Sequence, residues 1–203
     1  AVPADDAFCF YYRENLECLA ASGFRVRTFR PAEGQDLPAA DLVYLGGGYP
    51  ELYAEQLAQN RNFTEGLKQA SDAGRPILGE CGGLMALCRT LTAADGKTYP
   101  MAGALPAAAV MTGVRHGPTY VMAEAADNPL FTGSIRGHEY HYSDVVPDEG
   151  ARFAFEVKRG RGIRDGRDGL CCRQTVGSYL HQHALSAADW AGGLVAAAER
   201  ICD

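Results

Sequence analysis

Hydrophobic and polar positions follow two different periods along the first half of the chain. Short apolar runs bounded by turn residues are typical of strands. They lie at 7–12, 24–29, 41–45 and 75–80. Helical spacing of apolar residues fills the gaps between these runs. It covers 13–22, 51–73 (one long helix or two short ones) and 82–89. Alternation of strand and helix favours a parallel sheet with helices on both faces.

The second half of the chain has a different pattern, in which strands follow one another with turns between them. These strands are predicted at 102–112, 119–125, 139–146, 152–158 and 174–180. An amphipathic helix over 186–202, with Ser186 as its N-cap, closes the chain. Because no linker-like segment interrupts the sequence, we expect one α/β domain over residues 1–203. Its central sheet is expected to be mostly parallel, with an antiparallel extension.

Composition excludes several classes of protein. A chain of 203 residues with 47% hydrophobic residues can form a core, so disorder is excluded as its main state. The net charge of -6 argues against a nucleic-acid partner. The chain contains no run of about 18 apolar residues, so no membrane-spanning helix is predicted. Residues 1–6 lack the basic and apolar regions of a signal peptide. We therefore expect a cytoplasmic protein with no nucleic-acid or membrane partner.

Glycine and cysteine usage add two features. The 24 glycines exceed the usual share and cluster at 46–48, 82–83 and 160–169, which indicates tight turns and close backbone approach. The seven cysteines include no CxxC pair, which fits free thiols in a reducing compartment. Cys171 and Cys172 are neighbours, so in a strand they point to opposite faces. We therefore expect no metal site.

An apolar strand meets Cys81 in the segment that is most indicative of chemistry. Gly79, Cys81 and Gly83 form a Gly-x-Cys-x-Gly frame at a predicted strand-to-helix turn, which matches a nucleophile elbow with cysteine in place of serine. Glycines beside such a turn avoid side-chain clashes. The start of the helix lowers the thiol pKa and offers N–H groups to an oxyanion. The alternative is a buried structural cysteine.

A cysteine nucleophile requires a base. Of the five histidines, His181 follows the predicted strand 174–180, at the carboxyl edge where open α/β sheets form their active sites. A solvated or packing histidine is the alternative. The glycines 46–48 also follow a strand, and their backbone approaches a ligand closely, so Gly47 and Gly48 are candidates for completing an oxyanion hole opposite Cys81. By itself this run also fits a plain turn.

Several blocks of this sequence together resemble the glutamine amidotransferase domain of the cobyrinic acid a,c-diamide synthase family. The blocks lie at 6–16, 44–51, 79–83, 136–143, 169–170 and 177–183. That family belongs to the triad-type (class I) glutaminases, so the resemblance implies a class I glutaminase-like, three-layer αβα fold.

The resemblance also implies roles for individual residues. Cys81 attacks the side-chain amide of L-glutamine, and His181 activates the thiol and protonates the departing ammonia. The N–H of Gly82 and that of a glycine in 46–48 hold the oxyanion, and water releases glutamate from the thioester. The ammonia passes to a synthetase site, where ATP activates the a and c acetate carboxylates of a corrinoid.

Two further residues are candidates for the site. Arg115 suits the α-carboxylate of glutamine, because a guanidinium binds a carboxylate in bidentate fashion; a surface arginine is the alternative. Many class I glutaminases place a glutamate two residues after the catalytic histidine, and here that position is His183. Glu139 is therefore a possible orienting carboxylate for His181. The alternative is that the segment 138–141 only braces the wall of the site.

The sequence carries no phosphate loop for ATP. Gly96-Lys97-Thr98 hints at one, but the GxxxxGK[ST] pattern requires glycine at position 91, where the chain has Leu91. We therefore expect no cofactor in this domain, and ATP with Mg²⁺ in an N-terminal synthetase domain absent from this chain. The expected partners are L-glutamine, that synthetase domain and, through it, a corrinoid polycarboxylate.

Other functions stay open on the sequence alone. A different cysteine hydrolase or peptidase of the same fold would use the same elbow, and a glutaminase would also serve another tetrapyrrole or cell-wall amidation. A non-enzymatic module that binds metal through histidines and Cys171–Cys172 is a third alternative. The basic, glycine-rich segment 158–169 has three interpretations: it steers an anionic substrate, it covers a domain interface, or it is only a solvated loop.

Overall fold

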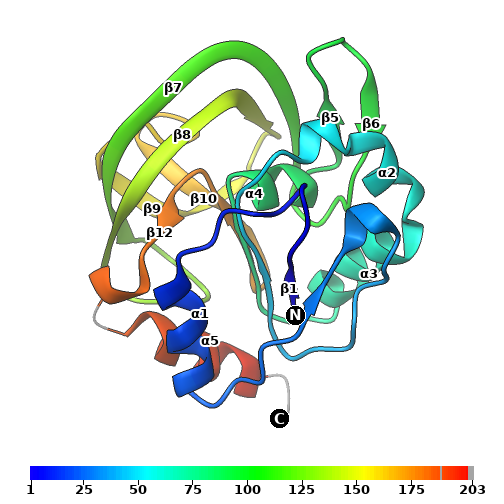
Figure 1. The fold of residues 1–203 in the computed structure, drawn as a ribbon. Helices are drawn as coiled ribbons and strands as arrows, with labels where there is room; N and C mark the ends of the chain where they lie inside the picture. Colours follow the sequence, from blue (N-terminus) through cyan, green and yellow to red (C-terminus); the bar gives the residue numbers. More distant parts are fainter. Residues whose placement is uncertain (188, 201–203) are drawn as a thin grey trace.

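The computed structural model describes residues 1–187 and 189–200, whose arrangement is shown in Figure 1. The α-helices are α1 (Arg13–Ala21), α2 (Ala54–Gln59), α3 (Arg61–Asp72), α4 (Gly82–Leu87) and α5 (Trp190–Glu199). The short 3₁₀ helices are η1 (Pro31–Glu33), η2 (Pro50–Leu52) and η3 (Ala184–Ser186). The strands are β1 (Val2–Pro3), β2 (Thr28–Phe29), β3 (Val43–Leu45), β4 (Ile77–Glu80), β5 (Thr90–Thr92), β6 (Thr98–Pro100), β7 (Ala107–Ala125), β8 (Ser134–Pro147), β9 (Arg152–Arg159), β10 (Arg167–Cys172), β11 (Thr175–Ser178) and β12 (His181–Gln182).

The large sheet has a parallel centre and a long antiparallel extension. Its strand order is β12-β8-β7-β9-β10-β11-β4-β3, with β5 and β6 attached beside β7. The neighbours β3, β4 and β11 run parallel, whereas the ladders along the path from β11 to β12 are antiparallel. The expected α/β class, with a parallel centre and an antiparallel extension, is confirmed. The extension contributes more ladders than the centre.

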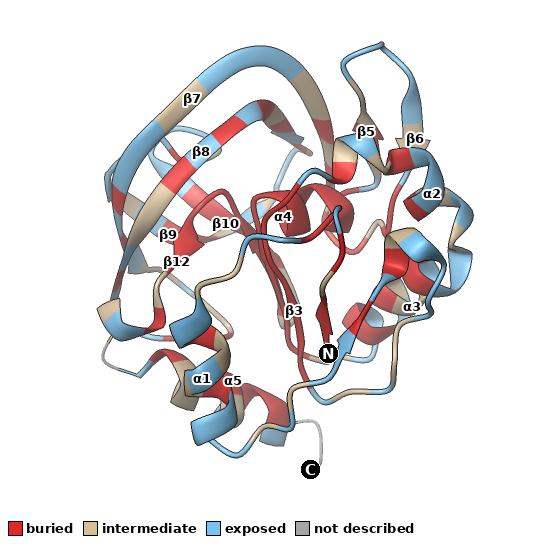
Figure 2. Cartoon of the chain, in the orientation of Figure 1, coloured by how far each residue is buried: buried red, intermediate tan, exposed pale blue. Residues whose placement is uncertain are grey.

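Alternating side chains of the central strands build two hydrophobic layers. Val43 and Leu45 of β3 share a buried cluster with Phe63 of α3. Tyr44, which points the other way, shares a second cluster with Leu194 of α5. Figure 1 shows α2 and α3 on one side of these strands and α1 and α5 on the other. Figure 2 shows that the strands between them are buried, which completes a three-layer αβα arrangement.

Parallel pairing brings three strand ends to one edge of the sheet. Leu45 of β3 aligns with Gly79 of β4, and Glu80 at the end of β4 aligns with Ser178 of β11. The chain leaves all three strands at this edge. The glycine turn after β3, Cys81 after β4 and the approach to His181 after β11 therefore come together, at the edge where open α/β sheets bind ligands.

The prediction of a strand over 7–12 is wrong. This segment crosses the carboxyl edge of the sheet and forms only isolated bridges there. The Tyr11 hydroxyl donates to the Pro3 carbonyl at 2.6 Å and accepts from the Gly46 N–H at 2.9 Å. The run of aromatic residues therefore packs against strand ends instead of joining a ladder, a distinction that local hydrophobicity does not contain.

Other element boundaries also differ from the predictions. The strands predicted at 102–112 and 119–125 are one strand, β7, which arches with β8 over the sheet in Figure 1. The segment 51–73 holds two helices, α2 and α3. The terminal helix begins at Trp190, and Ser186 belongs to η3 instead of capping it; the predicted end at 202 lies outside the described residues. The short strands β1, β5, β6 and β12 and the turn-flanked β10 were not predicted.

We predict that Gly83→Ala destabilises the protein and that Gly66→Ala does not. A Cβ at Gly83 would overlap the carbonyl oxygen of Leu45, where α4 packs on β3, whereas a Cβ at Gly66 of α3 would lie 3.4 Å from Leu37. Overpacking costs about 1–3 kcal/mol, and alanine in place of helical glycine gains up to about 1 kcal/mol. Urea unfolding followed by circular dichroism measures both, and equal free energies of unfolding would contradict the prediction.

Candidate active site

Cys81 occupies a strained turn between β4 and α4. Its backbone has φ 48° and ψ -97°, a left-handed conformation that residues other than glycine seldom adopt. The Cys81 N–H donates to the Ser178 carbonyl at 2.7 Å, which ties the turn to β11. A Cβ at Gly79 would lie 2.9 Å from the backbone of Gly83, and a Cβ at Gly83 would overlap Leu45, so both glycines of the frame are needed for the turn to close. This is the geometry that the nucleophile-elbow motif predicts.

The Cys81 thiol is almost fully enclosed, with 6% of the residue exposed. Burial and, after it, the carboxylate of Glu51 raise its pKa to about 12. The N–H of Gly82 acts in the opposite direction, as expected at the start of a helix, but it does not outweigh burial. The helix start thus acts in the expected direction, but the net pKa of the thiol is raised because burial is the larger effect. The thiol is neutral at neutral pH.

His181 lies on β12 and is as buried as Cys81. Burial, followed by the neighbouring rings of His138 and His141, lowers its pKa to about 3, so the imidazole is also neutral. A Cβ at Gly47 would lie 3.1 Å from His181 Nδ1, which places this glycine against the ring. His181 and Glu80 both line a cavity of about 320 Å³ whose other walls come from the segment 9–12, His138 and Tyr140.

The glycine turn presents one of its N–H groups beside Cys81. The Gly46 N–H donates to the Tyr11 hydroxyl and the Gly47 N–H donates to the Phe10 carbonyl at 3.2 Å. Within residues 1–187 and 189–200, the N–H groups of Gly48 and Gly82 have no acceptor among backbone oxygens. A Cβ at Gly82 would lie 3.0 Å from the Gly48 nitrogen, so these two amides are close together. Gly48 and Gly82 are thus better placed than Gly47 to hold an oxyanion.

Arg115 lies on β7 and is exposed to solvent. A hydrogen bond to Tyr140 raises the pKa of Tyr142, and the nearby charge of Arg115 opposes this rise. The two tyrosine hydroxyls are 2.8 Å apart, and Tyr140 lines the cavity that contains His181. The charge of Arg115 therefore acts near Tyr142, which is linked to this cavity through Tyr140, and the role of Arg115 as a carboxylate ligand stays a prediction.

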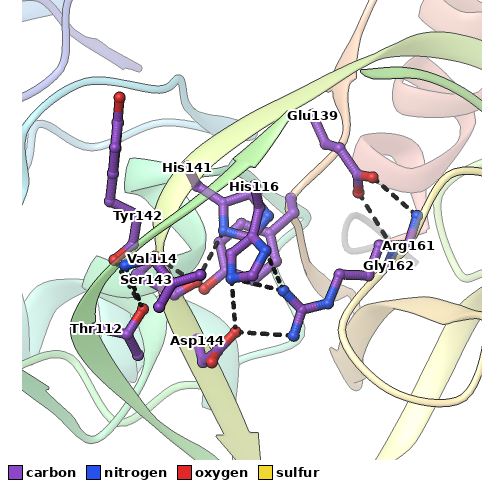
Figure 3. A network of polar contacts seen from close by, with 11 residues as sticks. Thr112, Val114, His116, Glu139, His141, Tyr142, Ser143, Asp144, Arg161 and Gly162 are labelled. Atoms are coloured by element: carbon purple, nitrogen blue, oxygen red, sulfur yellow. Dashed lines mark hydrogen bonds and ion pairs between the residues drawn. The ribbon is translucent and has the colours of Figure 1, made fainter. Parts of the chain in front are cut away.

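Glu139 holds a loop, and among the described residues it forms no hydrogen bond with His181. Its two oxygens accept from the N–H groups of Arg161 and Gly162 at 2.8 and 3.2 Å, as Figure 3 shows. Neighbouring strand residues point to opposite faces, so Glu139 points away from the face that His138 shares with His181. The orienting role remains a prediction without support from these contacts. Glu139 instead holds the glycine-rich segment 158–169 on the sheet.

The same network extends from Arg161 to His116 and Asp144, two residues to which the motifs assigned no role. The Arg161 guanidinium contacts the His116 ring and lies 3.3 Å from Asp144 (Figure 3). His141 stacks on Tyr179 with ring centroids 3.6 Å apart, and burial lowers the pKa of His141 to about 4. These contacts secure β8 and the loop behind the site.

His138 supports the candidate base directly. Its ring stacks on His181 with centroids 4.6 Å apart and an interplanar angle of 7°. The Tyr12 hydroxyl lies 3.0 Å from His138 Nδ1. The strand pairing that aligns His138 with His181 accounts for this stack, and it agrees with a bracing role for segment 138–141.

Glu80 is a site residue that sequence reasoning missed, although it stands next to Cys81. Only 1% of it is exposed, and burial raises its pKa to about 8. Its carboxyl group accepts from the Gln182 N–H at 3.2 Å and from the Tyr44 hydroxyl at 3.1 Å. It therefore links the residue beside the candidate nucleophile to the residue beside the candidate base. The available signal was a glutamate at the end of an otherwise apolar strand.

No group of three or more histidine, cysteine, aspartate or glutamate side chains in the described residues is arranged to hold a metal ion. Across those residues, the helices are too short or too polar to cross a membrane.

A strained cysteine at a strand-to-helix turn, with two nearby amides that lack backbone acceptors in the described residues and a buried histidine after the neighbouring strand β11, is typical of α/β enzymes that attack a carbonyl carbon through a thiol. Solved structures agree with the fold. A crystal structure of a glutamine amidotransferase aligns with a TM-score of 0.63 at 17% identity and covers 98% of both chains. The structure of PurLQS from Thermotoga maritima aligns with a TM-score of 0.64 at 16% identity, over 100% of this chain and 97% of that one.

Sequence comparison gives the family. Residues 1–189 match the CobB/CobQ-like glutamine amidotransferase domain, and the chain belongs to this family. A cobyrinate a,c-diamide synthase of Methanothermobacter thermautotrophicus is 43% identical over 193 residues, which are 94% of this chain and 42% of that protein. The protein of the same name from Halobacterium salinarum is 47% identical over 191 residues, with 93% and 43% covered. The chain thus spans less than half the length of these relatives.

We predict that Glu80→Gln reduces the pH dependence of stability between about pH 4.5 and 8. The ordinary pKa of 4.5 rises to about 8 in the folded protein, so folded Glu80 keeps a proton that the unfolded chain loses. Its contribution is present below pH 4.5 and is lost as the pH rises to 8, with a slope of about 1.4 kcal/mol per pH unit. Asp168, whose pKa burial raises to about 7, leaves a residual slope.

Urea unfolding at several pH values measures this slope. Glu55→Gln, at an exposed position of α2, is the matched control and should keep the wild-type slope. A Glu80→Gln protein with an unchanged slope would show that Glu80 is ionised in the folded state.

Proposed function

We propose that this domain hydrolyses the side-chain amide of L-glutamine to glutamate and ammonia through a thioester on Cys81. The observation that supports this most directly is the strained Cys81 turn, beside which the N–H groups of Gly48 and Gly82 lie close together without a backbone acceptor among the described residues. Membership of a glutamine amidotransferase family supports glutamine as the substrate.

The reaction starts from a neutral thiol and a neutral imidazole, because burial opposes both charges. As the Cys81 sulfur bonds to the amide carbon, the thiol proton moves to His181 and the carbonyl oxygen becomes an oxyanion between Gly48 and Gly82. Collapse of this intermediate breaks the C–N bond, and His181 returns the proton to the leaving ammonia. Water, deprotonated by His181, then adds to the thioester and releases glutamate and the free thiol.

The ammonia serves a second reaction outside this domain in our proposal. The relatives are named for making an a,c-diamide from cobyrinate, and this chain matches about 42–43% of their length. We infer that an N-terminal synthetase domain uses ATP and Mg²⁺ to activate the a and c acetate carboxylates of a corrinoid, which the ammonia then amidates. The role is in cobalamin biosynthesis in the cytoplasm, and this domain supplies nitrogen and needs no cofactor.

A cysteine peptidase with the same fold and the same nucleophile elbow is the alternative function. It requires a groove for an extended peptide, whereas Cys81 and His181 are each 6% exposed. An enclosed site suits a small amide better than a polypeptide.

We predict that Cys81→Ala lowers glutamine hydrolysis about a thousand-fold or more, because no other side chain replaces the thiol as nucleophile. Glutamate release measures the rate. The glutamine analogue diazo-oxonorleucine should label Cys81 in the wild type, as detected by peptide mass spectrometry.

Cys18→Ala is the matched control, since Cys18 lies on α1, partly exposed and away from the turn. It should retain wild-type hydrolysis and labelling. An active Cys81→Ala protein would exclude the thioester. A wild-type protein that neither hydrolyses glutamine nor reacts with the analogue, even with its synthetase domain present, would exclude the glutaminase.

A further inference from the structure

The carboxylate of Glu51 stands beside the candidate nucleophile and has no role in the reaction described above. Glu51 lies on η2, which directly follows the glycine turn. A Cβ at Gly82 would lie 2.9 Å from the ring of Pro50, so η2 packs against the first residue of α4. Glu51 is therefore anchored one residue from a contact with the Cys81 turn.

One oxygen of this carboxylate lacks a partner. Oε2 of Glu51 is buried and accepts no hydrogen bond from the described residues, and no lysine or arginine in those ranges forms an ion pair with it. Burial raises the pKa of Glu51. Leaving a buried acceptor unpaired costs free energy, so native proteins rarely do so without a ligand or a water that completes the site.

The charge of Glu51 acts on Cys81. After burial, it is the largest cause of the raised pKa of the Cys81 thiol, ahead of Glu80 and Asp168. A carboxylate with this influence lies within electrostatic reach of the sulfur. In the free protein it opposes the thiolate, and only a cation would cancel that opposition.

Two other buried carboxylates near Cys81 are already engaged. Glu80 accepts from Gln182 and Tyr44. Asp168 has an unpartnered Oδ2, but its Oδ1 accepts from the Gly169 and Tyr179 N–H groups, and only 1% of the residue is exposed. Glu51 as a whole residue is only partly buried, in contrast to these two.

We propose that Glu51 binds the α-ammonium group of L-glutamine and makes the site selective for amides that carry this group. The inference rests on the proposed glutaminase function and deepens it. With Arg115 as the candidate for the α-carboxylate, the two residues recognise the two charges of a free amino acid. The ion pair also neutralises Glu51, so substrate binding removes the charge that opposes the Cys81 thiolate.

The test compares L-glutamine with 4-carbamoylbutanoate, which is the same molecule without the amine. In wild-type protein, kcat/KM should be about 10- to 100-fold higher for glutamine, the range expected for a charge-assisted hydrogen bond. Glu51→Gln should lose that preference, chiefly through a higher KM for glutamine. It should not lower kcat/KM for 4-carbamoylbutanoate, because loss of the carboxylate lowers the pKa of the attacking thiol. Glu55→Gln, four residues further on and exposed, is the matched control and should keep the preference.

A second readout needs no turnover. L-Glutamate should protect Cys81 of the wild type from alkylation by iodoacetamide better than glutarate does, and Glu51→Gln should abolish this difference. Without ligand, Glu51→Gln should be alkylated faster at a given pH, because loss of the carboxylate lowers the thiol pKa. A purely structural role predicts neither change. Glu51→Asp, which keeps the charge, should retain part of the preference and provides the test if Glu51→Gln fails to fold.

Equal losses for both substrates in Glu51→Gln, or a wild type without preference between glutamate and glutarate, would overturn the inference. Failure of the proposed function looks different. In that case the wild type neither hydrolyses glutamine nor reacts with diazo-oxonorleucine, whatever residue stands at position 51.

Discussion

The site depends on the parallel pairing of β4 with β3 on one side and β11 on the other. This pairing sets three strand ends side by side, and the 2.7 Å hydrogen bond from Cys81 to Ser178 locks the turn to its neighbour. The backbones are so close that a Cβ at Gly83 would overlap Leu45. Close backbone approach thus brings the amides of Gly48 and Gly82 together beside the Cys81 turn.

Burial controls the electrostatics of the site. The thiol and the imidazole are both neutral, and three carboxyl groups act on the thiol, from Glu51, Glu80 and Asp168. Such surroundings disfavour a resting thiolate, which protects the sulfur from other electrophiles. A substrate that brings a positive charge changes this balance. Such a substrate charge would couple binding to activation of the thiol, which would restrict reactivity to amides that carry it.

The chemistry of the turn was predictable because it is local. The glycines beside Cys81 and the helix after it are consecutive in sequence, and the strained φ of 48° follows from that pattern. The partners of the charged residues were not predictable. Glu139 and Glu80 differ little as sequence features, yet one bonds loop amides and the other lies between the nucleophile turn and the strand of the base. Those partners are far apart along the chain, so only folding decides them.

The sequence by itself determined the αβα class, the nucleophile turn and the order of the candidate residues, because hydrophobic period and turn chemistry act over a few residues. The tertiary structure decided which amides stay free. Gly47 and Gly48 are equivalent by sequence, but in the fold the Gly47 N–H donates to the Phe10 carbonyl. It also decided that 7–12 is no strand, and that the thiol pKa rises instead of falling. Burial and long-range pairing produce these outcomes, and neither is encoded in a local pattern.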